Sequence, residues 1–197
     1  EKHENGVGLL MSENARKAML GYNPVNERVL TVRFNAYPKN ITVIVVYAPT
    51  TSHSDEEIET FYERLEDVIE KVDKNDMKIV IGDWNAKIGH DNTGWEDEMG
   101  LHGLGDRNSR GERLLLFAKQ YSLYMANTKF YSRYNRKWTW ESFSGKHRNM
   151  IDFVLTEQKI RSGITRCRSV HSVDVGSDHQ LVMCHISVKI SSKTRNG

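Results

Sequence analysis

Two short polar segments, each beside an apolar run, carry residue types suited to phosphate chemistry. Asp83 and Asn85 follow an apolar run, and Asp178 and His179 are adjacent just before another. A carboxylate can orient or deprotonate water, and a neutral amide can hydrogen-bond a phosphoryl oxygen without repelling it. Aspartate can also hold a hard metal ion, while histidine can donate to charge developing on phosphorus. The segments therefore suit metal-assisted attack of water on a phosphate.

Two further residues could complete such a site. Asp152 lies in the apolar run 150–155, where a carboxylate is costly unless it has a partner or faces a sheet edge. It is a candidate to orient the second ring nitrogen of His179. Tyr47 ends another apolar run and could hydrogen-bond a phosphate oxygen. Structural explanations stay open: an Asx turn at Asp83, an outward-facing strand residue at Asp152 and a half-buried sheet tyrosine at Tyr47.

The hydrophobic pattern predicts strands that could position these residues. β-Branched runs at 28–34 and 41–47 are separated by a turn signal at Pro38, and together they predict an antiparallel hairpin. Other apolar runs predict the remaining strands. These are expected at 6–11, 78–81, 137–142, 150–155, 164–170 and 180–188.

Two helices and a long loop are predicted between the strands. Apolar residues at helical spacing from Phe61 to Val72 predict an amphipathic helix within an acidic stretch. Residues 82–111 are rich in Gly, Asn and Asp and are expected to form a long functional loop. The second helix is expected to begin at Ser109, which has capping-box spacing with Glu112.

The order of these elements predicts a single α/β domain. Strands grouped before and after the helices indicate a mixed-sheet sandwich, not a regularly alternating parallel sheet. The chain has 197 residues, of which 38% are apolar and 27% charged, as is typical of a globular protein. No apolar run is long enough for a membrane span, so no membrane partner is expected. Cys167 and Cys184 are too few for a disulfide scaffold, which favours a reducing, intracellular compartment.

Four ordered motifs resemble the exonuclease-endonuclease-phosphatase (DNase I-like) family. They are Val-Tyr-Ala-Pro-Thr at 46–50, Ile-Gly-Asp-Trp-Asn-Ala at 81–86, Thr-Trp at 139–140 with Ile-Asp-Phe-Val-Leu at 151–155, and Ser-Asp-His-Gln-Leu-Val at 177–182. The stretch 108–115 is especially similar to RTE/BovB-type non-LTR retrotransposon endonuclease domains and a domesticated relative of them. The resemblance covers about 6–188 and implies a DNase I-like mixed β-sandwich flanked by helices.

The same resemblance implies roles for individual residues. The family's water-positioning pair matches Asp83 and Asn85, and the carboxylate that orients the phosphate-side histidine matches Asp152. The implied reaction is hydrolysis of a DNA phosphodiester by activated water, with Mg²⁺ or Mn²⁺ screening the charge. The implied catalytic set is Tyr47, Asp83, Asn85, Asp152 and His179, and the implied metal ligand is Asp178.

The resemblance also implies a departure at the N-terminus. Family members begin with two more strands and a helix, which carry an Asn and the Glu that supplies the main metal carboxylate. Such a unit takes about 30 residues, more than the residues before Gly6 could supply. We therefore expect one N-terminally truncated domain over 1–197, with a flexible tail at 189–197, weakened metal binding and little nuclease activity. Exposed strands left by the truncation could also support a dimer.

A basic and aromatic segment is the candidate DNA-binding surface. Between Lys129 and Arg148, six Lys or Arg residues stand against one acid, Glu141, with aromatic residues interleaved. Basic side chains neutralise phosphates and aromatic side chains stack on bases, although a solvated hairpin with core-facing aromatics stays open. The candidates, with arginines from the preceding loop and helix, are Arg107, Arg110, Arg133, Arg136, Lys137, Trp140, Lys146 and Arg148.

Three functions stay open from the sequence. The leading one is a metal-dependent DNA endonuclease-type phosphodiesterase of retrotransposon origin, impaired by the expected truncation, with DNA as partner and a nuclear location. The alternative is a catalytically inactive, domesticated module that binds DNA or protein, including chromatin proteins. A phosphatase acting on a small phosphoester is the third. The basic aromatic segment mildly favours DNA over a small substrate.

Overall fold

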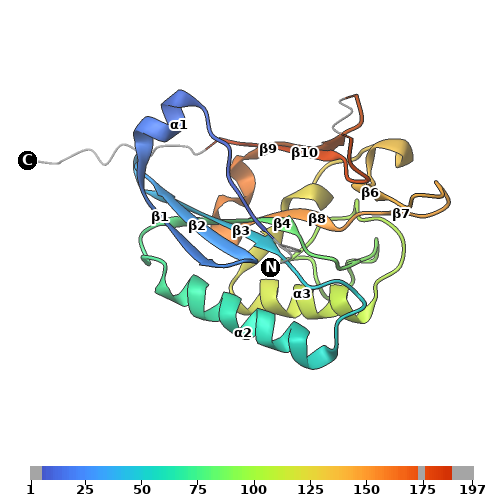
Figure 1. Cartoon of the computed structure of the whole chain (residues 1–197). Helices are drawn as coiled ribbons and strands as arrows, with labels where there is room; N and C mark the ends of the chain where they lie inside the picture. Colours follow the sequence, from blue (N-terminus) through green and yellow to red (C-terminus); the bar gives the residue numbers. More distant parts are fainter. Residues whose placement is uncertain (1–5, 173–175, 188–197) are drawn as a thin grey trace, which may run out of the picture.

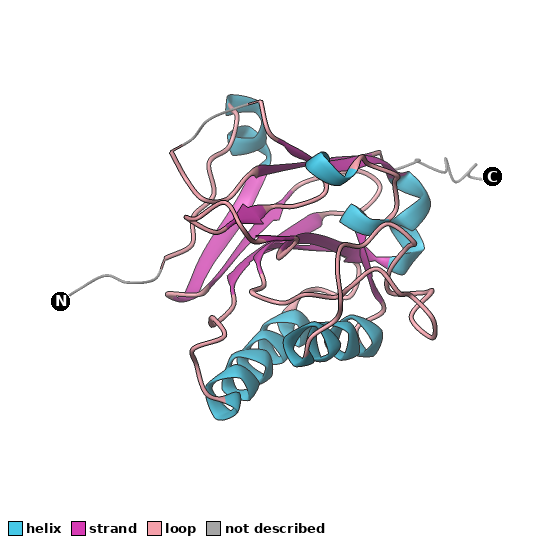
Figure 2. Ribbon diagram, turned by 90° about the vertical axis from the view of Figure 1, so that its right-hand side faces the viewer, coloured by secondary structure: helices cyan, strands magenta, loops and turns pink. Residues whose placement is uncertain are grey.

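The computed structural model describes residues 6–172 and 176–187, which form three layers (Figure 1). Two long helices lie on one face of a six-stranded sheet, and a two-stranded sheet lies on the other; Figure 2 shows the same layers after a 90° turn. The helices are α1 (Glu13–Ala18), α2 (Asp55–Lys71) and α3 (Ser109–Gln120), with 3-10 turns η1 (Ala126–Thr128), η2 (Tyr134–Arg136) and η3 (Gln158–Gly163). The strands are β1 (Met19–Asn26), β2 (Val29–Phe34), β3 (Ile41–Tyr47), β4 (Met77–Asp83), β5 (Leu123–Met125), β6 (Trp140–Glu141), β7 (Arg148–Asn149), β8 (Asp152–Glu157), β9 (Ile164–Val170) and β10 (Leu181–Ile186).

The central sheet has the order β1–β2–β3–β4–β8–β5 and combines both strand directions. β3 and β4 are parallel, and their register places Tyr47 opposite Asp83. β4 and β8 are antiparallel, and their register places Asp83 opposite Asp152. Three of the predicted site residues therefore meet at one end of the sheet. The architecture confirms the predicted α/β mixed sandwich.

The main core lies between the central sheet and α2 and α3. The face of α2 buries Phe61 and Leu65, and α3 buries Leu114 and Phe117, against sheet residues such as Val80. Burying an apolar side chain of this size contributes about 2 kcal/mol. α2 begins at a capping box, in which Ser54 and Glu57 bond each other's main-chain N–H groups. These contacts hold the two helices beneath the strands that end at the site.

A smaller core holds the two-stranded sheet against the central one. It contains Tyr124, Val154, Ile164 and Cys167. β9 pairs antiparallel with β10, with Cys167 directly opposite Cys184 and both thiols free. Because β10 follows the His179 segment, this core also fixes that segment relative to β8. No helix in the described part of the chain is long and apolar enough to span a membrane.

Several predicted elements are confirmed, and others are wrong. β2 and β3 form the predicted antiparallel hairpin. Residues 6–11 form no strand, although Leu9 and Met11 are half-buried, because no neighbouring strand pairs with them. The first described strand is β1, which was not predicted because it buries few side chains; β5 was also not predicted. Residue 188 and the tail 189–197 lie outside the described residues.

α3 begins at Ser109, as predicted, but its cap differs from the predicted capping box. Asn108, not Ser109, is the N-cap, and its side-chain oxygen accepts the N–H of Gly111 at 2.8 Å. Asn and Ser are comparable N-caps, so spacing alone could not rank them. The strand expected at 137–142 shortens to β6, which pairs with the two residues of β7.

Candidate active site

The main chain at the end of β4 requires a glycine. Gly82 has a φ of +151°, and a Cβ at this position would lie 1.8 Å from the carbonyl oxygen of Val46 in β3. Glycine therefore lets β3 and β4 stay paired up to the residue that carries the first site carboxylate. That residue is Asp83, which is half-buried.

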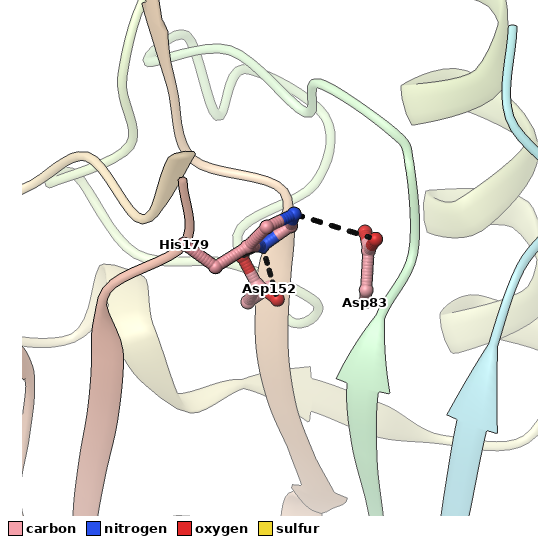
Figure 3. Close-up of side chains that lie close together, drawn as sticks. All are labelled: Asp83, Asp152 and His179. Carbon is pink, nitrogen blue, oxygen red and sulfur yellow. Dashed lines mark hydrogen bonds and ion pairs between the residues drawn. The ribbon is translucent and has the colours of Figure 1, made fainter. Parts of the chain in front are cut away.

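Asp83, Asp152 and His179 form a compact cluster (Figure 3). Nδ1 of His179 lies 3.2 and 3.0 Å from the two carboxylate oxygens of Asp152. Its other nitrogen, Nε2, lies 3.9 Å from Oδ2 of Asp83. Each residue offers one potential ligand atom, and these atoms all lie within 4.8 Å of one another. The cluster could therefore hold a metal ion.

The environment moves the pKa of both Asp83 and His179. Burial, followed by the negative charge of Asp152, raises the pKa of Asp83 to about 6, although hydrogen bonds from Asn85 oppose the rise. The hydrogen bond with Asp152 raises the pKa of His179 against the opposing effect of burial. A carboxylate with a raised pKa can accept a proton, and a histidine whose protonated form is stabilised can donate one, so the pair suits proton transfer.

Asn85 is held so that its amide oxygen stays available. Its main-chain N–H donates to Oδ1 of Asp83 at 2.9 Å. Its side-chain nitrogen donates to the carbonyl of Ala48 at 2.9 Å and to Oδ2 of Asp83 at 3.2 Å. Both partners are acceptors, so the amide nitrogen must face them. The oxygen can then bind water, a metal ion or a ligand.

Two buried polar residues, neither of which was assigned a role from the sequence, position Asp152. The hydroxyl of Thr139 accepts the N–H groups of Ile151 and Asp152, at 3.0 and 3.1 Å. The side chain of Asn127 donates to the carbonyl of Asp152 at 3.0 Å and accepts the N–H of Val154 at 2.9 Å. Thr139 also accepts the N–H of Gln180 through its carbonyl at 2.7 Å, which links Asp152 to the His179 segment.

Asp178 lies outside the compact cluster but is firmly oriented. The indole N–H of Trp140 donates to its Oδ2 at 2.8 Å. The main-chain carbonyl of Asp178 accepts the N–H of Glu141 at 3.0 Å, and Trp140 forms a β-bridge with His179. The short β6–β7 hairpin therefore fixes both Asp178 and His179.

Five of the six predicted catalytic and metal-binding residues line one cavity of about 600 Å³. The exception is Asp152. Asp152 instead accepts a hydrogen bond from Nδ1 of His179, on the side of the ring opposite Nε2. The guanidinium of Arg28 lies 5.2 Å from the ring centre of Tyr47, which helps to fix that ring. The cavity lining consists of Tyr47, Thr50, Thr51, Asp83, Asn85, Lys87, Asn108, Trp140, Asn149, Ile151, Asp178 and His179. The sequence reasoning missed Lys87, although its spacing from Asp83 and Asn85 was a usable signal.

The predicted DNA-binding residues divide into two groups. Several contact the protein itself: Arg107 donates to the carbonyls of Ile88 and Asp91, and Arg110 forms an ion pair with Asp55. Likewise, Lys137 donates to the carbonyl of Gly103, Arg148 forms an ion pair with Glu141, and Trp140 lines the cavity. The side chains of the second group are exposed. These are Arg133, Arg136 and Lys146.

The aromatic residues of the basic segment also divide by position. Trp138 is buried, so the core-facing alternative holds for this residue. Phe143, between β6 and β7, is fully exposed, and Tyr131 and Tyr134 are largely exposed. The hairpin that contacts the site therefore presents an aromatic side chain to solvent.

Known proteins resemble this chain in sequence or in fold. Craniofacial development protein 2 of Bos taurus is 38% identical over 186 residues, which cover 94% of this chain and 31% of that protein. The chain thus spans about a third of the length of this relative. The endonuclease domain of TRAS1, a telomere-specific non-LTR retrotransposon, matches with a TM-score of 0.59 and 18% identity over 82% of this chain and 63% of its own. The 3′ phosphatase NExo from Neisseria, solved with a product DNA hairpin, matches with a TM-score of 0.61 and 15% identity. The match covers 86% of this chain and 72% of the phosphatase chain.

The two solved structures establish a shared fold, and the sequence matches establish the family. They confirm the resemblance to DNase I-like nucleases that the four motifs predicted. A profile of one family covers residues 41–183, from the start of β3 into β10. That range contains Tyr47, Asp83, Asp152 and His179. The chain belongs to the endonuclease-reverse transcriptase family.

Proposed function

We propose that this domain hydrolyses phosphodiester bonds of DNA in a reaction that depends on a divalent metal ion. The observation that carries the proposal is the geometry of His179, whose Nδ1 is held by Asp152 while Nε2 faces Asp83 across 3.9 Å. Such a histidine has one nitrogen fixed and the other available for chemistry. The site lines a cavity that can admit a substrate.

Each side chain has a role that follows from its surroundings. Asp83, with a pKa near 6, accepts a proton from a water molecule that the amide of Asn85 orients. His179 donates from Nε2 to the negative charge that develops on the phosphoryl group, and Asp152 stabilises its protonated form. Tyr47 donates its hydroxyl to a phosphate oxygen.

The donor atoms fit a divalent cation. Carboxylate and amide oxygens are the ligands that Mg²⁺ prefers, and a nearby imidazole is also compatible with Mn²⁺. Asp178, which lines the same cavity, is the proposed metal ligand, and the amide oxygen of Asn85 is a second available donor. The bound ion would act as a Lewis acid that screens the charge of the phosphate.

Two observations support DNA as the substrate. The β6–β7 hairpin joins the site through Trp140 and presents Phe143 and Lys146 to solvent, where they could contact bases and phosphates. The related solved structures include a retrotransposon endonuclease and a phosphatase bound to a DNA hairpin. A DNA substrate would also be consistent with a nuclear location. A dimer and chromatin partners stay predictions, which sedimentation and affinity purification would test.

A catalytically inactive DNA- or protein-binding module is the second candidate. One observation favours it: Asp178, the proposed metal ligand, lies outside the compact cluster of potential metal ligands formed by Asp83, Asp152 and His179. If Asp178 stayed apart from that cluster in the presence of metal ions, the domain would bind DNA without cutting it.

A plasmid-nicking assay tests the two candidates. We expect the wild type to nick supercoiled DNA slowly with Mg²⁺ or Mn²⁺ and not at all with EDTA. His179→Ala is expected to reduce the rate by roughly a hundredfold or more. Asp67→Asn, on the exposed face of α2, is the control and should not change the rate. A folded wild type that binds DNA but does not nick it would favour the inactive module, and nicking that survives His179→Ala would refute the assigned roles.

A further inference from the structure

Lys87 is the one lysine or arginine among the described residues that line the candidate active-site cavity. It follows Asp83 and Asn85 at intervals of two residues, and all three side chains are half-buried. The intervening residues Trp84 and Ala86 are buried in the main core. This segment therefore presents an acid, an amide and an amine in turn to the same cavity.

The main chain of Lys87 is fixed by the start of α3. Its N–H donates to the side-chain oxygen of Asn108 at 3.1 Å, and its carbonyl accepts the N–H of Asn108 at 3.0 Å. The same Asn108 oxygen caps α3 by accepting the N–H of Gly111. A Cβ at Gly111 would lie 1.8 Å from the carbonyl oxygen of Lys87, so the helix packs directly on this residue. The main chain of Lys87 is therefore held in a fixed position relative to α3.

The ammonium group of Lys87 forms no hydrogen bond or ion pair with a residue in the described part of the chain. Other cations near the site differ, since Arg110 pairs with Asp55 and Arg148 pairs with Glu141. A half-buried cation without an acidic partner is poorly compensated, and an anionic ligand would supply the missing charge.

We propose that Lys87 binds a phosphate oxygen of the substrate and so positions the phosphodiester backbone against Asp83 and His179. This assignment rests on the proposed function, because it requires a phosphate in the cavity. The neutral donors Thr50 and Asn108 line the cavity with Lys87 and suit the remaining phosphate oxygens. A lysine acts here as a point charge, so it adds affinity for the backbone without selecting a base.

Equilibrium binding of a short labelled duplex in EDTA tests this contact without any cleavage. Lys87→Gln keeps most of the stem and removes the charge, and Lys87→Arg restores it. Lys39→Gln is the matched control, because Lys39 is exposed in the turn that precedes β3, at the end remote from Tyr47. We expect Lys87→Gln to weaken binding roughly tenfold and to lower the slope of log affinity against log salt by about one. Lys87→Arg and Lys39→Gln should retain most of the wild-type affinity.

A scan of methylphosphonates through the duplex locates the contact. A methylphosphonate removes the charge of one phosphate, so at the contacted position it should weaken wild-type binding but leave Lys87→Gln binding unchanged. A merely structural lysine would show no such coupling. Unchanged affinity and slope in Lys87→Gln, or a wild type that binds no duplex, would overturn the assignment.

The nicking assay separates this assignment from the proposed function. If the wild type nicks DNA while Lys87→Gln binds and nicks equally well, the lysine assignment fails and the proposed function stands. If the wild type does not nick DNA but Lys87→Gln loses affinity with methylphosphonate coupling, the phosphate contact stands and the catalytic function fails.

Discussion

Both carboxylate oxygens of Asp152 lie within hydrogen-bond distance of Nδ1 of His179, at 3.2 and 3.0 Å. Asp152 is itself positioned by Thr139 and Asn127, which bond its main-chain N–H and carbonyl. The orientation of His179 therefore depends on a chain of buried contacts that begins outside the cavity. Such contacts fix which ring nitrogen faces the substrate.

Asp152→Asn is expected to lower the pKa of His179. The hydrogen bond with Asp152 is the largest cause of its raised pKa, and the charge of Asp152 adds to it. Asp178→Asn is the comparison, because the charge of Asp178 contributes less, and it should lower the same pKa by a smaller amount. The ring-proton chemical shift of His179 in EDTA, followed against pH by NMR, measures both changes. An equal effect of the two substitutions would contradict the assigned contact.

Asp83→Asn is expected to stabilise the folded chain at neutral pH while removing the proposed proton acceptor. Burial and Asp152 raise the pKa of Asp83 from 3.8 to about 6, so the folded state binds this proton more tightly than the unfolded state. Ionised Asp83 therefore costs stability above pH 6, and the cost disappears as the pH falls below about 4. At pH 7 this pKa difference corresponds to about 3 kcal/mol, which is the largest gain in free energy of unfolding expected for the variant.

Urea unfolding in EDTA at pH 7 and pH 4 measures this effect. The advantage of the variant should shrink at the lower pH, where wild-type Asp83 is protonated. The asparagine oxygen can still accept the main-chain N–H of Asn85, but the 3.2 Å hydrogen bond from the side-chain amide of Asn85 to Oδ2 is lost, which reduces the expected gain. A variant less stable than the wild type at pH 7 would show that ionised Asp83 does not lower the free energy of unfolding.

Much of the site could be predicted from the sequence because its residues stand at the ends of strongly apolar runs. Asp83 and Asp152 could be placed near strand ends, and the pairing of β4 with β8 brings them together. The family motifs supplied the partnership of Asp152 with His179, which spacing along the chain had left open. The structure adds the distances, 3.0 Å from Nδ1 of His179 to Asp152 and 3.9 Å from Nε2 to Asp83.

The remaining positions depend on contacts that leave no local pattern. Thr139 and Asn127 act through hydrogen bonds to the main chain around Asp152, and neither the Thr-Trp motif at 139–140 nor the residue type of Asn127 indicates such a contact. The DNA-binding role predicted for Arg110 was drawn from charge alone, whereas its guanidinium contacts Asp55 and the carbonyl of His53. The strand β1 buries too few side chains to show an apolar pattern.

Trp140→Phe is expected to weaken divalent-metal binding roughly tenfold. The substitution keeps an aromatic ring but removes the indole N–H that donates to Asp178 at 2.8 Å. Without this donor the carboxylate of Asp178 loses its fixed orientation. Calorimetric titration with Mn²⁺ measures the affinity directly, so the result does not depend on cleavage.

Trp138→Phe provides the matched control for that experiment. Trp138 is buried, and its indole nitrogen has no hydrogen-bond partner among the described residues. Its loss should leave metal affinity unchanged, with thermal unfolding reporting any packing defect separately. Equal metal affinities for Trp140→Phe and the wild type would mean that the Trp140 contact does not prepare Asp178 for the ion.

Asp76→Asn is expected to destabilise the fold at neutral pH. Asp76 directly precedes β4, at the opposite end of that strand from Asp83. Asp76 is 1% exposed, and Oδ2 accepts hydrogen bonds from Arg33 and Thr42, both at 2.7 Å. The hydrogen bond from Arg33 is the main reason that its pKa is lowered. This stabilisation is present above the ordinary carboxyl pKa and is lost as the pH falls through the lower folded value. At pH 7 we expect a loss of about 2 kcal/mol in free energy of unfolding.

Asp73→Asn is the control for the Asp76 prediction, because Asp73 contacts the same arginine but is exposed. Its carboxylate lies 3.2 Å from Arg33 with 45% of the side chain accessible, so its loss should cost at most about 0.5 kcal/mol. Urea unfolding at pH 7 and at about pH 3 measures both variants, with the acid value set below the ordinary Asp pKa. The deficit of Asp76→Asn should narrow in acid, because below the ordinary Asp pKa the unfolded wild type takes up a proton that the folded state binds less tightly. A deficit that stayed constant across this range would assign the cost to side-chain packing instead of to the ionised carboxylate.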